Sequence, residues 1–264
     1  MSKRNAVLLI GCGRMGSAIA RTLATKHDVY AFDPLADVPP NVNRIDSLHS
    51  PSLPSALYVF LAVKPQSLES SASQLSDLAQ PGRVFISILA GITLERLSEI
   101  LGDEVPIIRA MPNTPVAIGH GITAATASRT LTQDETNDVS DMLELLGDFL
   151  WIDRERDLDI VTAMSGSGPA YFFRFAEALL RAGIVQGLPD FQAEKLIRQT
   201  FIGAARLCEA EALSFEKLRE EVTSPGGTTE AGLTIMAENA IIDRLADKIV
   251  REAATRSREL AKAH

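Results

Sequence analysis

The fold is decided by the stretch Ala6-Val7-Leu8-Leu9-Ile10-Gly11-Cys12-Gly13-Arg14-Met15-Gly16, in which an apolar run leads directly into a G-x-G-x-x-G motif. The apolar run predicts a buried strand, and the residues from Met15 onwards predict a helix. In such a motif the first glycine permits a tight turn, the second leaves room for a pyrophosphate, and the third lets helix and strand pack closely. Free N–H groups at the helix start can bind the anion. The stretch therefore predicts a dinucleotide-binding loop, called the glycine loop (residues 11–16) below.

Over about the first 150 residues, short β-branched runs alternate with stretches of helical periodicity. That alternation is typical of βαβ units around a parallel sheet. Strands are predicted at residues 6–11, 29–33, 57–63, 84–89, 105–110 and 121–126, and helices at 15–25, 66–79, 93–101 and 132–146. The proline-rich segment 39–54 is predicted to be a loop.

The rest of the chain is predicted to be helical, after a short strand at residues 149–153. We therefore assign the chain to the α/β class, with an N-terminal Rossmann-type parallel sheet domain (residues 1–155) followed by an all-α C-terminal dimerisation domain (residues 156–264). The predicted helix 168–187 is apolar around most of its circumference, so it needs cover on several sides. A second subunit is the nearest such cover, and we expect a homodimer or higher homo-oligomer through the C-terminal helices.

Composition and charge exclude several classes of protein. A formal charge of −8 over 264 residues argues against a nucleic-acid partner, because phosphate-binding proteins normally carry a basic excess. The two cysteines, Cys12 and Cys208, are too few and too far apart to suggest disulfides or a zinc site, and they favour a reducing compartment. No stretch approaches the roughly 20 apolar residues of a membrane-spanning helix. We expect a cytoplasmic protein with no metal and no membrane partner.

The end of the second predicted strand bears on the choice of cofactor. Asp33 lies about 20 residues beyond the glycines, where a carboxylate can accept ribose hydroxyls and repel a 2′-phosphate, which favours NADH. The alternative is a turn or capping aspartate before Pro34. Arg14 is the only nearby basic side chain that we expect to reach a 2′-phosphate, because the next one along is Arg44. The choice between NADPH and NADH therefore stays open.

The third predicted strand ends in a second candidate segment for cofactor binding, which consists of Ala62, Val63, Lys64 and Pro65. It stands at the carboxyl edge of the sheet, where ligands bind in such folds, and we expect it to line the nicotinamide half of the site. The alternative for Lys64 is an ordinary solvated lysine.

Two stretches rich in Gly, Ser and Thr stand at predicted helix starts. The first, called the Ser/Gly turn, holds Ser165, Gly166, Ser167 and Gly168, and the second, called the hydroxyl loop, holds Ser224, Pro225, Gly226, Gly227, Thr228 and Thr229. Both offer clustered N–H and hydroxyl donors that suit a small carboxylate. Simple helix capping explains either stretch alone. Together with a cofactor site, the two stretches favour an anionic substrate.

These segments resemble the pyrroline-5-carboxylate reductase family in their order and spacing. The resemblance is carried by the glycine loop, residues 62–65, the run Arg109-Ala110-Met111-Pro112-Asn113-Thr114-Pro115, the Ser/Gly turn and the hydroxyl loop, and it covers nearly the whole chain. It implies reduction of the cyclic imine 1-pyrroline-5-carboxylate to L-proline, the last step of proline biosynthesis, with an interlocked helical dimer.

The resemblance also implies roles for individual residues. Thr229 and Ser224 would be the catalytic candidates, and Thr229 would be the hydroxyl donor to the ring nitrogen. Gly226, Gly227 and Thr228 would complete the substrate site, and Asn113 with the Ser/Gly turn would lie beside the nicotinamide. The family often uses NADPH and tends to carry small polar or basic residues after the second strand, so Asp33 departs from its pattern.

Two other functions remain as alternatives. β-Hydroxyacid dehydrogenases resemble the chain at the Ser/Gly turn, but they place a catalytic lysine in the following helix, where this chain has Arg174 and no lysine before Lys195. A non-catalytic dinucleotide sensor would keep the glycine loop and would not need an intact hydroxyl loop. Hydride transfer to an iminium requires no catalytic histidine, which agrees with four histidines that form no evident constellation.

Overall fold

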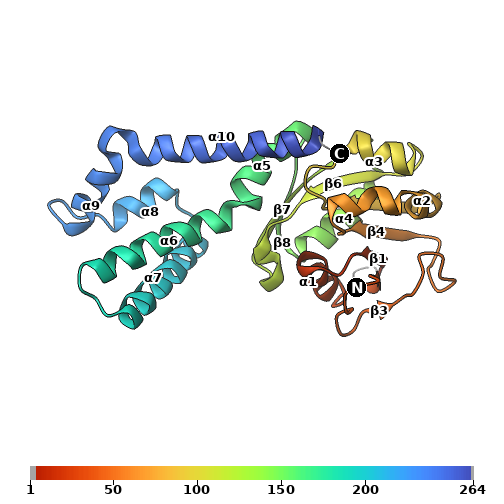
Figure 1. Cartoon of the computed structure of the whole chain (residues 1–264), viewed down its shortest axis with the longest axis horizontal. Coiled ribbons are helices and arrows are strands. Elements are labelled where there is room, and N and C mark those ends of the chain that lie inside the picture. The colour runs from red at the N-terminus through yellow and green to blue at the C-terminus, as the bar shows by residue number, and fades with distance from the viewer. Residues whose placement is uncertain (1–3, 263–264) are drawn as a thin grey trace. The chain divides into compact units, whose positions relative to one another are not determined.

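A single sheet organises the first part of the chain in the computed structural model, which describes residues 4–262 (Figure 1). The strands are β1 (Ala6–Ile10), β2 (Asp28–Phe32), β3 (Asn43–Arg44), β4 (Leu57–Leu61), β5 (Arg83–Ser87), β6 (Ile107–Met111), β7 (Gly121–Ala127) and β8 (Gly147–Trp151). Their order in the sheet is β3-β2-β1-β4-β5-β6-β7-β8. The first six strands are parallel, which confirms a Rossmann-type sheet.

The far end of the sheet differs from an all-parallel arrangement. Strand β7 pairs with β6 in the antiparallel direction, and β8 is parallel to β7. The connection between β6 and β7 holds only a 3-10 helix, η2 (Thr114–Ile118), and a parallel crossover needs a dozen or more residues. The short, proline-rich link between these strands therefore reverses the chain direction.

Helices cover both faces of the sheet. The helices of this part are α1 (Arg14–Leu23), η1 (Pro65–Ser67), α2 (Leu68–Leu78), α3 (Leu94–Leu101), α4 (Gln133–Glu144), η3 (Glu155–Asp157), α5 (Leu158–Val161) and η4 (Thr162–Gly166). One core cluster packs α1 and α4 on one face, through Ile19 and Met142 for example. A second cluster packs α2 and α3 on the other face, through Leu75 and Leu97. The alternation of side chains along β1 feeds both clusters, because Val7 and Leu9 face one side and Leu8 the other.

The segment predicted as a loop at residues 39–54 contains a strand. Asn43 and Arg44 form β3, which pairs in parallel with Tyr30 and Ala31 of β2 at the edge of the sheet. Two residues are too few to show an alternating pattern, so the prolines and polar residues around them dominate the sequence signal.

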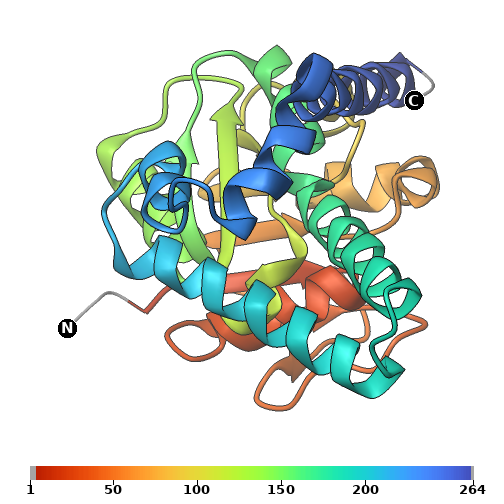
Figure 2. The same cartoon turned by 90° about the vertical axis from the view of Figure 1, so that its left-hand side faces the viewer.

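The helical part consists of α6 (Gly168–Val185), α7 (Asp190–Ala210), α8 (Phe215–Glu221), α9 (Thr228–Ala237), η5 (Glu238–Ala240) and α10 (Ile241–Lys262). The chain divides into two compact units, one of residues 1–167 with 251–264 and the other of residues 168–250. The division at residues 155 and 156 that the sequence predicts for the domains stays a prediction. Helices α6 and α7 pack side by side within the second unit (Figure 2).

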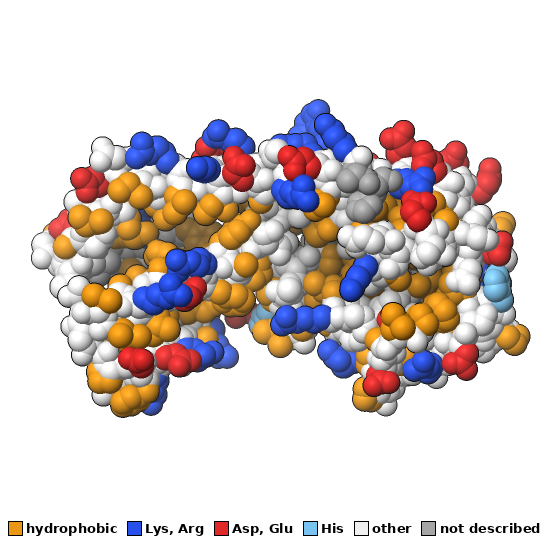
Figure 3. Space-filling model, viewed as in Figure 1, with side chains coloured by type: hydrophobic (Ala, Val, Ile, Leu, Met, Phe, Trp, Pro, Cys, Tyr) orange, Lys and Arg blue, Asp and Glu red, His pale blue; other side chains and the backbone are white. Residues whose placement is uncertain are grey.

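The second unit exposes large apolar side chains. Phe172, Phe173 and Phe175 of α6 are between 48% and 63% exposed, and orange side chains spread over this unit in Figure 3. Such continuous apolar exposure is typical of a surface that another chain covers. Across residues 4–262, no helix combines the length and apolar character that a membrane span requires.

Candidate active site

The glycine loop leads from β1 into α1 and needs glycine at two of its positions for steric reasons. Gly11 has φ +100°, and a Cβ there would lie 2.7 Å from the backbone carbonyl of Ala62. A Cβ on Gly16 would lie 2.0 Å from the carbonyl oxygen of Gly11. Gly13 differs, because a Cβ there would meet nothing within 4 Å. The open space at Gly13 fits the close approach of a dinucleotide pyrophosphate.

The start of α1 offers donors to such a ligand. Gly13 is the N-cap residue, and no side chain caps the helix. Arg14 is exposed, whereas Met15 packs against the core cluster under α1. The first N–H groups of the helix and its dipole are therefore available to an anion, as a phosphate site requires.

Asp33 ties the glycine loop to the end of β2. Its Oδ2 accepts the N–H of Cys12 at 2.6 Å, and its Oδ1 accepts the N–H groups of Leu35 and Ala36 at 2.8 Å each. Burial acts to raise the pKa of Asp33, but these three N–H groups and nearby Arg44 outweigh it and hold the pKa below its ordinary value. Asp33 therefore has the turn-forming role that the sequence offered as an alternative, and its carboxylate also contacts the glycine loop through Cys12.

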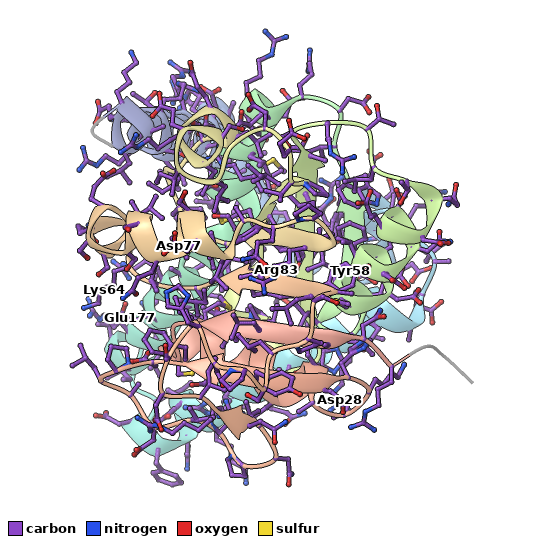
Figure 4. The ribbon with its side chains drawn as sticks, turned by 90° about the vertical axis from the view of Figure 1, so that its right-hand side faces the viewer. Asp28, Tyr58, Lys64, Asp77, Arg83 and Glu177 are labelled. Carbon is purple, nitrogen blue, oxygen red and sulfur yellow. The ribbon has the colours of Figure 1, made fainter. Side chains whose placement is uncertain are left out.

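The segment after β4 lies beside the glycine loop. The Ala62 N–H donates to the carbonyl of Ile10 at 2.8 Å, and Val63 packs against the core under α2 and α3. Lys64 is the exposed N-cap of η1, and Pro65 fills its first turn. In Figure 4, Lys64 lies at the end of the sheet opposite Asp28 and Tyr58, which stand near the beginnings of β2 and β4. Residues 62–65 thus share the carboxyl edge of the sheet with the glycine loop.

Asn113 and Ser165 come together from distant parts of the sequence. The Nδ2 of Asn113 donates to the Oγ of Ser165 at 3.3 Å, while its Oδ1 accepts the N–H of Ile122 at 3.0 Å. Only 9% of Asn113 is exposed. The N–H of Ile122 fixes which end of the amide faces Ser165, and the serine hydroxyl keeps its own proton free to donate elsewhere.

The Ser/Gly turn has a different local structure from the one predicted. Ser165 and Gly166 belong to a π-helical turn, η4, which follows α5 without a break, and Ser167 donates its N–H to the carbonyl of Thr162 at 2.9 Å. Ser165, Gly166 and Ser167 therefore stand directly before the predicted helix, but they continue a preceding helical turn. Gly168 begins α6. Single π turns occur frequently at functional sites.

One ion pair near Asn113 was missed by sequence reasoning. Arg109, which is 3% exposed, contacts the Oε1 of Glu155 through Nη1 at 2.7 Å, and the same oxygen accepts the N–H of Leu94 at 2.8 Å. The pair joins β6 to the starts of α3 and η3. An arginine inside the apolar run of β6 was the available signal, because buried charges are normally paired.

The hydroxyl loop belongs to the helical unit and leads into α9, whose first two residues are Thr228 and Thr229. Gly227 is the N-cap of α9 and no side chain caps it, so capping by a hydroxyl does not explain the loop. Gly226 has φ +71° and donates its N–H to the Oε2 of Glu230 at 2.7 Å. Its remaining members, Ser224, Thr228 and Thr229, are exposed, and their hydroxyls have no hydrogen-bond partner among the described residues. These hydroxyls are free for a ligand.

The predicted site residues thus fall into two groups. The glycine loop, Asp33, residues 62–65, Asn113 and residues 165–167 belong to the first unit, and Gly168 with the hydroxyl loop belongs to the second. Within residues 4–262, no group of His, Cys, Asp or Glu side chains is arranged to hold a metal ion.

Two family models match the chain. Residues 6–91 match a model described as NADP oxidoreductase, coenzyme F420-dependent, and residues 155–260 match one described as pyrroline-5-carboxylate reductase dimerisation.

Named relatives match nearly the whole chain. A pyrroline-5-carboxylate reductase of Pseudomonas aeruginosa is 33% identical over 97% of this chain and 96% of its own. A structure of a pyrroline-5-carboxylate reductase from Coxiella burnetii has a TM-score of 0.88 and 30% identity, and covers 98% of this chain and 99% of its own. That of the Plasmodium falciparum enzyme with NADP bound has a TM-score of 0.79 and 27% identity, and covers 97% of this chain and 98% of its own. The chain therefore belongs to the pyrroline-5-carboxylate reductase family.

Proposed function

We propose that the protein reduces 1-pyrroline-5-carboxylate to L-proline with NADH or NADPH, the last step of proline biosynthesis. The observation that carries the proposal is the likeness to a named reductase along 97% of the chain. The glycine loop and the hydroxyl loop of this chain are both intact. When bound, the reduced nicotinamide supplies the hydride that reaches the imine carbon. The residues of this chain bind and orient the two reactants.

The glycine loop holds the dinucleotide in this proposal. The open space at Gly13 accepts the pyrophosphate, and the uncapped start of α1 donates N–H groups to it. Residues 62–65 line the nicotinamide side at the same edge of the sheet. Asn113 holds the Oγ of Ser165 as an acceptor, so that the serine proton points to a ligand.

The hydroxyl loop holds the imino acid. The substrate carboxylate and ring nitrogen are bound by Ser224, Gly226, Gly227 and Thr228. Thr229 donates a hydrogen bond to that nitrogen, and a proton taken up there through the hydroxyl is replaced from water. The exposed and unpartnered hydroxyl of Thr229 supports this role. The carboxylate of Glu230 already occupies the N–H of Gly226, so substrate binding requires it to move away from that group.

The assembly we propose is a homodimer, or a higher homo-oligomer, through the C-terminal helices. The exposed phenylalanines of α6 and the match of residues 155–260 to a dimerisation model support it. Light scattering tests the proposal, and a monomer at micromolar concentration would contradict it. Location in the cytoplasm stays a prediction, which is consistent with two cysteines that are both free thiols.

The first test follows the loss of nicotinamide absorbance when NADH or NADPH is mixed with 1-pyrroline-5-carboxylate. A matched assay supplies a 3-hydroxy acid with NAD⁺. Consumption of reduced cofactor with the imine, and L-proline as its product, supports the proposal. Oxidation of the hydroxy acid alone would favour a dehydrogenase, and inactivity in both assays with intact cofactor binding would favour a sensor.

A further inference from the structure

Arg44 lies on β3, one strand outward from Asp33. It is in register with Ala31 of β2, and the N–H of Ile45 donates to the carbonyl of Ala31 at 3.0 Å. Side chains in register on adjacent strands share a face, and residues two apart along a strand return to that face. Arg44, Ala31 and Asp33 therefore lie on the face of the sheet that α1 covers, where the glycine loop begins the helix.

The charge of Arg44 reaches the cofactor loop. It acts to lower the pKa of Asp33 and that of Cys12, although burial is the largest influence on both groups and acts in the opposite direction. Arg44 contacts the Oδ1 of Asp46 through Nε at 3.7 Å, and side-chain exposures of 50% and 97% make this a weak ion pair. The guanidinium is therefore free to take a stronger anionic partner.

Asp33 is a weaker obstacle to a 2′-phosphate than its sequence position suggests. Both of its oxygens accept backbone N–H groups, from Cys12 on one side and from Leu35 and Ala36 on the other. Three donors and a nearby guanidinium offset the negative charge that a phosphate would meet. Arg44 therefore brings a positive charge to the end of β2 from the neighbouring strand.

We propose that Arg44 binds the 2′-phosphate of NADPH and sets the preference of this protein between the two nicotinamide cofactors. The inference rests on the proposed function only in assuming that the glycine loop binds a dinucleotide. A planar guanidinium can donate two parallel N–H bonds to phosphate oxygens, which suits this role better than an ammonium group. Asp33 anchors the loop, and Arg44 recognises the extra phosphate.

The test compares 2′,5′-ADP with 5′-AMP, which differ only in the 2′-phosphate, by calorimetry on the full-length protein without imine. The variants are Arg44→Ala, Arg44→Lys and the comparison variant Arg14→Ala, which removes the exposed arginine of the glycine loop itself. We expect Arg44→Ala to weaken the binding of 2′,5′-ADP roughly 10- to 100-fold, the size of a charge-assisted contact, and to leave the binding of 5′-AMP unchanged. Arg44→Lys should recover part of that loss.

Three outcomes overturn the proposal. They are equal binding of both nucleotides by the wild-type protein, discrimination that survives Arg44→Ala, and discrimination that is lost in Arg14→Ala but kept in Arg44→Ala. Because calorimetry uses no imine, failure of the reductase assay does not affect this result. Where the reductase is active, the ratio of kcat/KM for NADPH to that for NADH should fall in Arg44→Ala by a similar factor.

Discussion

The two glycine-containing loops of this protein are built in opposite ways. The glycine loop is fixed by contacts, because Gly11 and Gly16 sit against backbone atoms and Asp33 binds the N–H of Cys12. The hydroxyl loop is open at Gly226, where a Cβ would meet nothing within 4 Å, and the hydroxyl of Thr229 is unpartnered among the described residues. Only Gly227 is close to another atom of this loop, since a Cβ there would lie 2.5 Å from the Oγ of Ser224. The first loop gains its function from rigid geometry, and the second keeps its donors free for a ligand. Substitutions in the glycine loop should therefore lower mainly stability and cofactor binding, whereas substitutions in the hydroxyl loop should lower mainly turnover.

The largest effect is expected from Gly16→Ala. Its Cβ would overlap the carbonyl oxygen of Gly11 within the same loop, where no flexible side chain can move aside. We expect the free energy of unfolding to fall by about 3 kcal/mol and cofactor binding to be lost. Chemical denaturation and NADPH fluorescence titration measure the two quantities.

Gly13→Ala is the control for that change. The added methyl meets open space, so the stability should stay at the wild-type value while the cofactor affinity falls roughly tenfold, since the methyl occupies the place of the pyrophosphate. Equal stability of the two variants would contradict the steric argument for Gly16.

The next effect in size is expected from Thr229→Ala. Loss of a proton donor at the ring nitrogen should lower kcat about a hundredfold while the affinity for NADPH and the melting temperature stay unchanged. Thr234→Ala removes another exposed hydroxyl of α9, one that donates to the carbonyl of Glu230, and serves as the matched control. If both variants turn over at the wild-type rate, Thr229 has no part in the reaction.

A smaller effect should follow from Asp33→Asn. The amide cannot accept the N–H of Cys12 and those of Leu35 and Ala36 as a carboxylate does, and we expect a loss of about 1.5 kcal/mol at pH 7. Because folding lowers the pKa of Asp33, its contribution is complete above the unfolded value of about 3.9 and is lost as the pH falls through the folded value. The stabilities of variant and wild type should converge in acid, and a constant difference down to pH 2 would exclude the charge as the cause.

The smallest effect is expected from Gly226→Ala. Its φ of +71° disfavours any residue with a Cβ, but no atom stands in the way, so the cost should be about 1 kcal/mol. Thermal denaturation of Gly226→Ala is compared with that of Gly13→Ala, because a Cβ at Gly13 also meets open space but the φ there is not positive. The difference between the two variants gives the contribution of the backbone conformation. A loss as large as that of Gly16→Ala would show that the hydroxyl loop is as tightly built as the glycine loop.

The sequence predicted those features that depend on the types of residues close together along the chain. Three glycines at fixed spacing between a strand and a helix leave little choice of backbone path, and the apolar runs identify β1, β4 and β5 as buried strands. The open hydroxyls of residues 224–229 were also foreseeable from composition.

The features that sequence reasoning missed depend on chain direction or on contacts between distant residues. Nothing in the residues of η4 signals a π turn, and Asn113 meets Ser165 across 52 positions. The reversal of chain direction at β7 follows from the short connection between β6 and β7. The alternation of strands and helices in the sequence favours parallel strands and does not show this reversal. Strand β3 was hidden by its length of two residues, and with it the placement of Arg44 beside Asp33.

The position of Cys12 has a consequence for the chemical durability of the protein. Its thiol is 4% exposed, and burial raises its pKa, with the Asp33 carboxylate acting in the same direction. Oxidants and alkylating agents attack the thiolate, so a thiol held in its protonated form reacts slowly. A cysteine in the middle of the glycine loop would otherwise make the enzyme an easy target for peroxide. The carboxylate that anchors the loop also protects it from covalent damage.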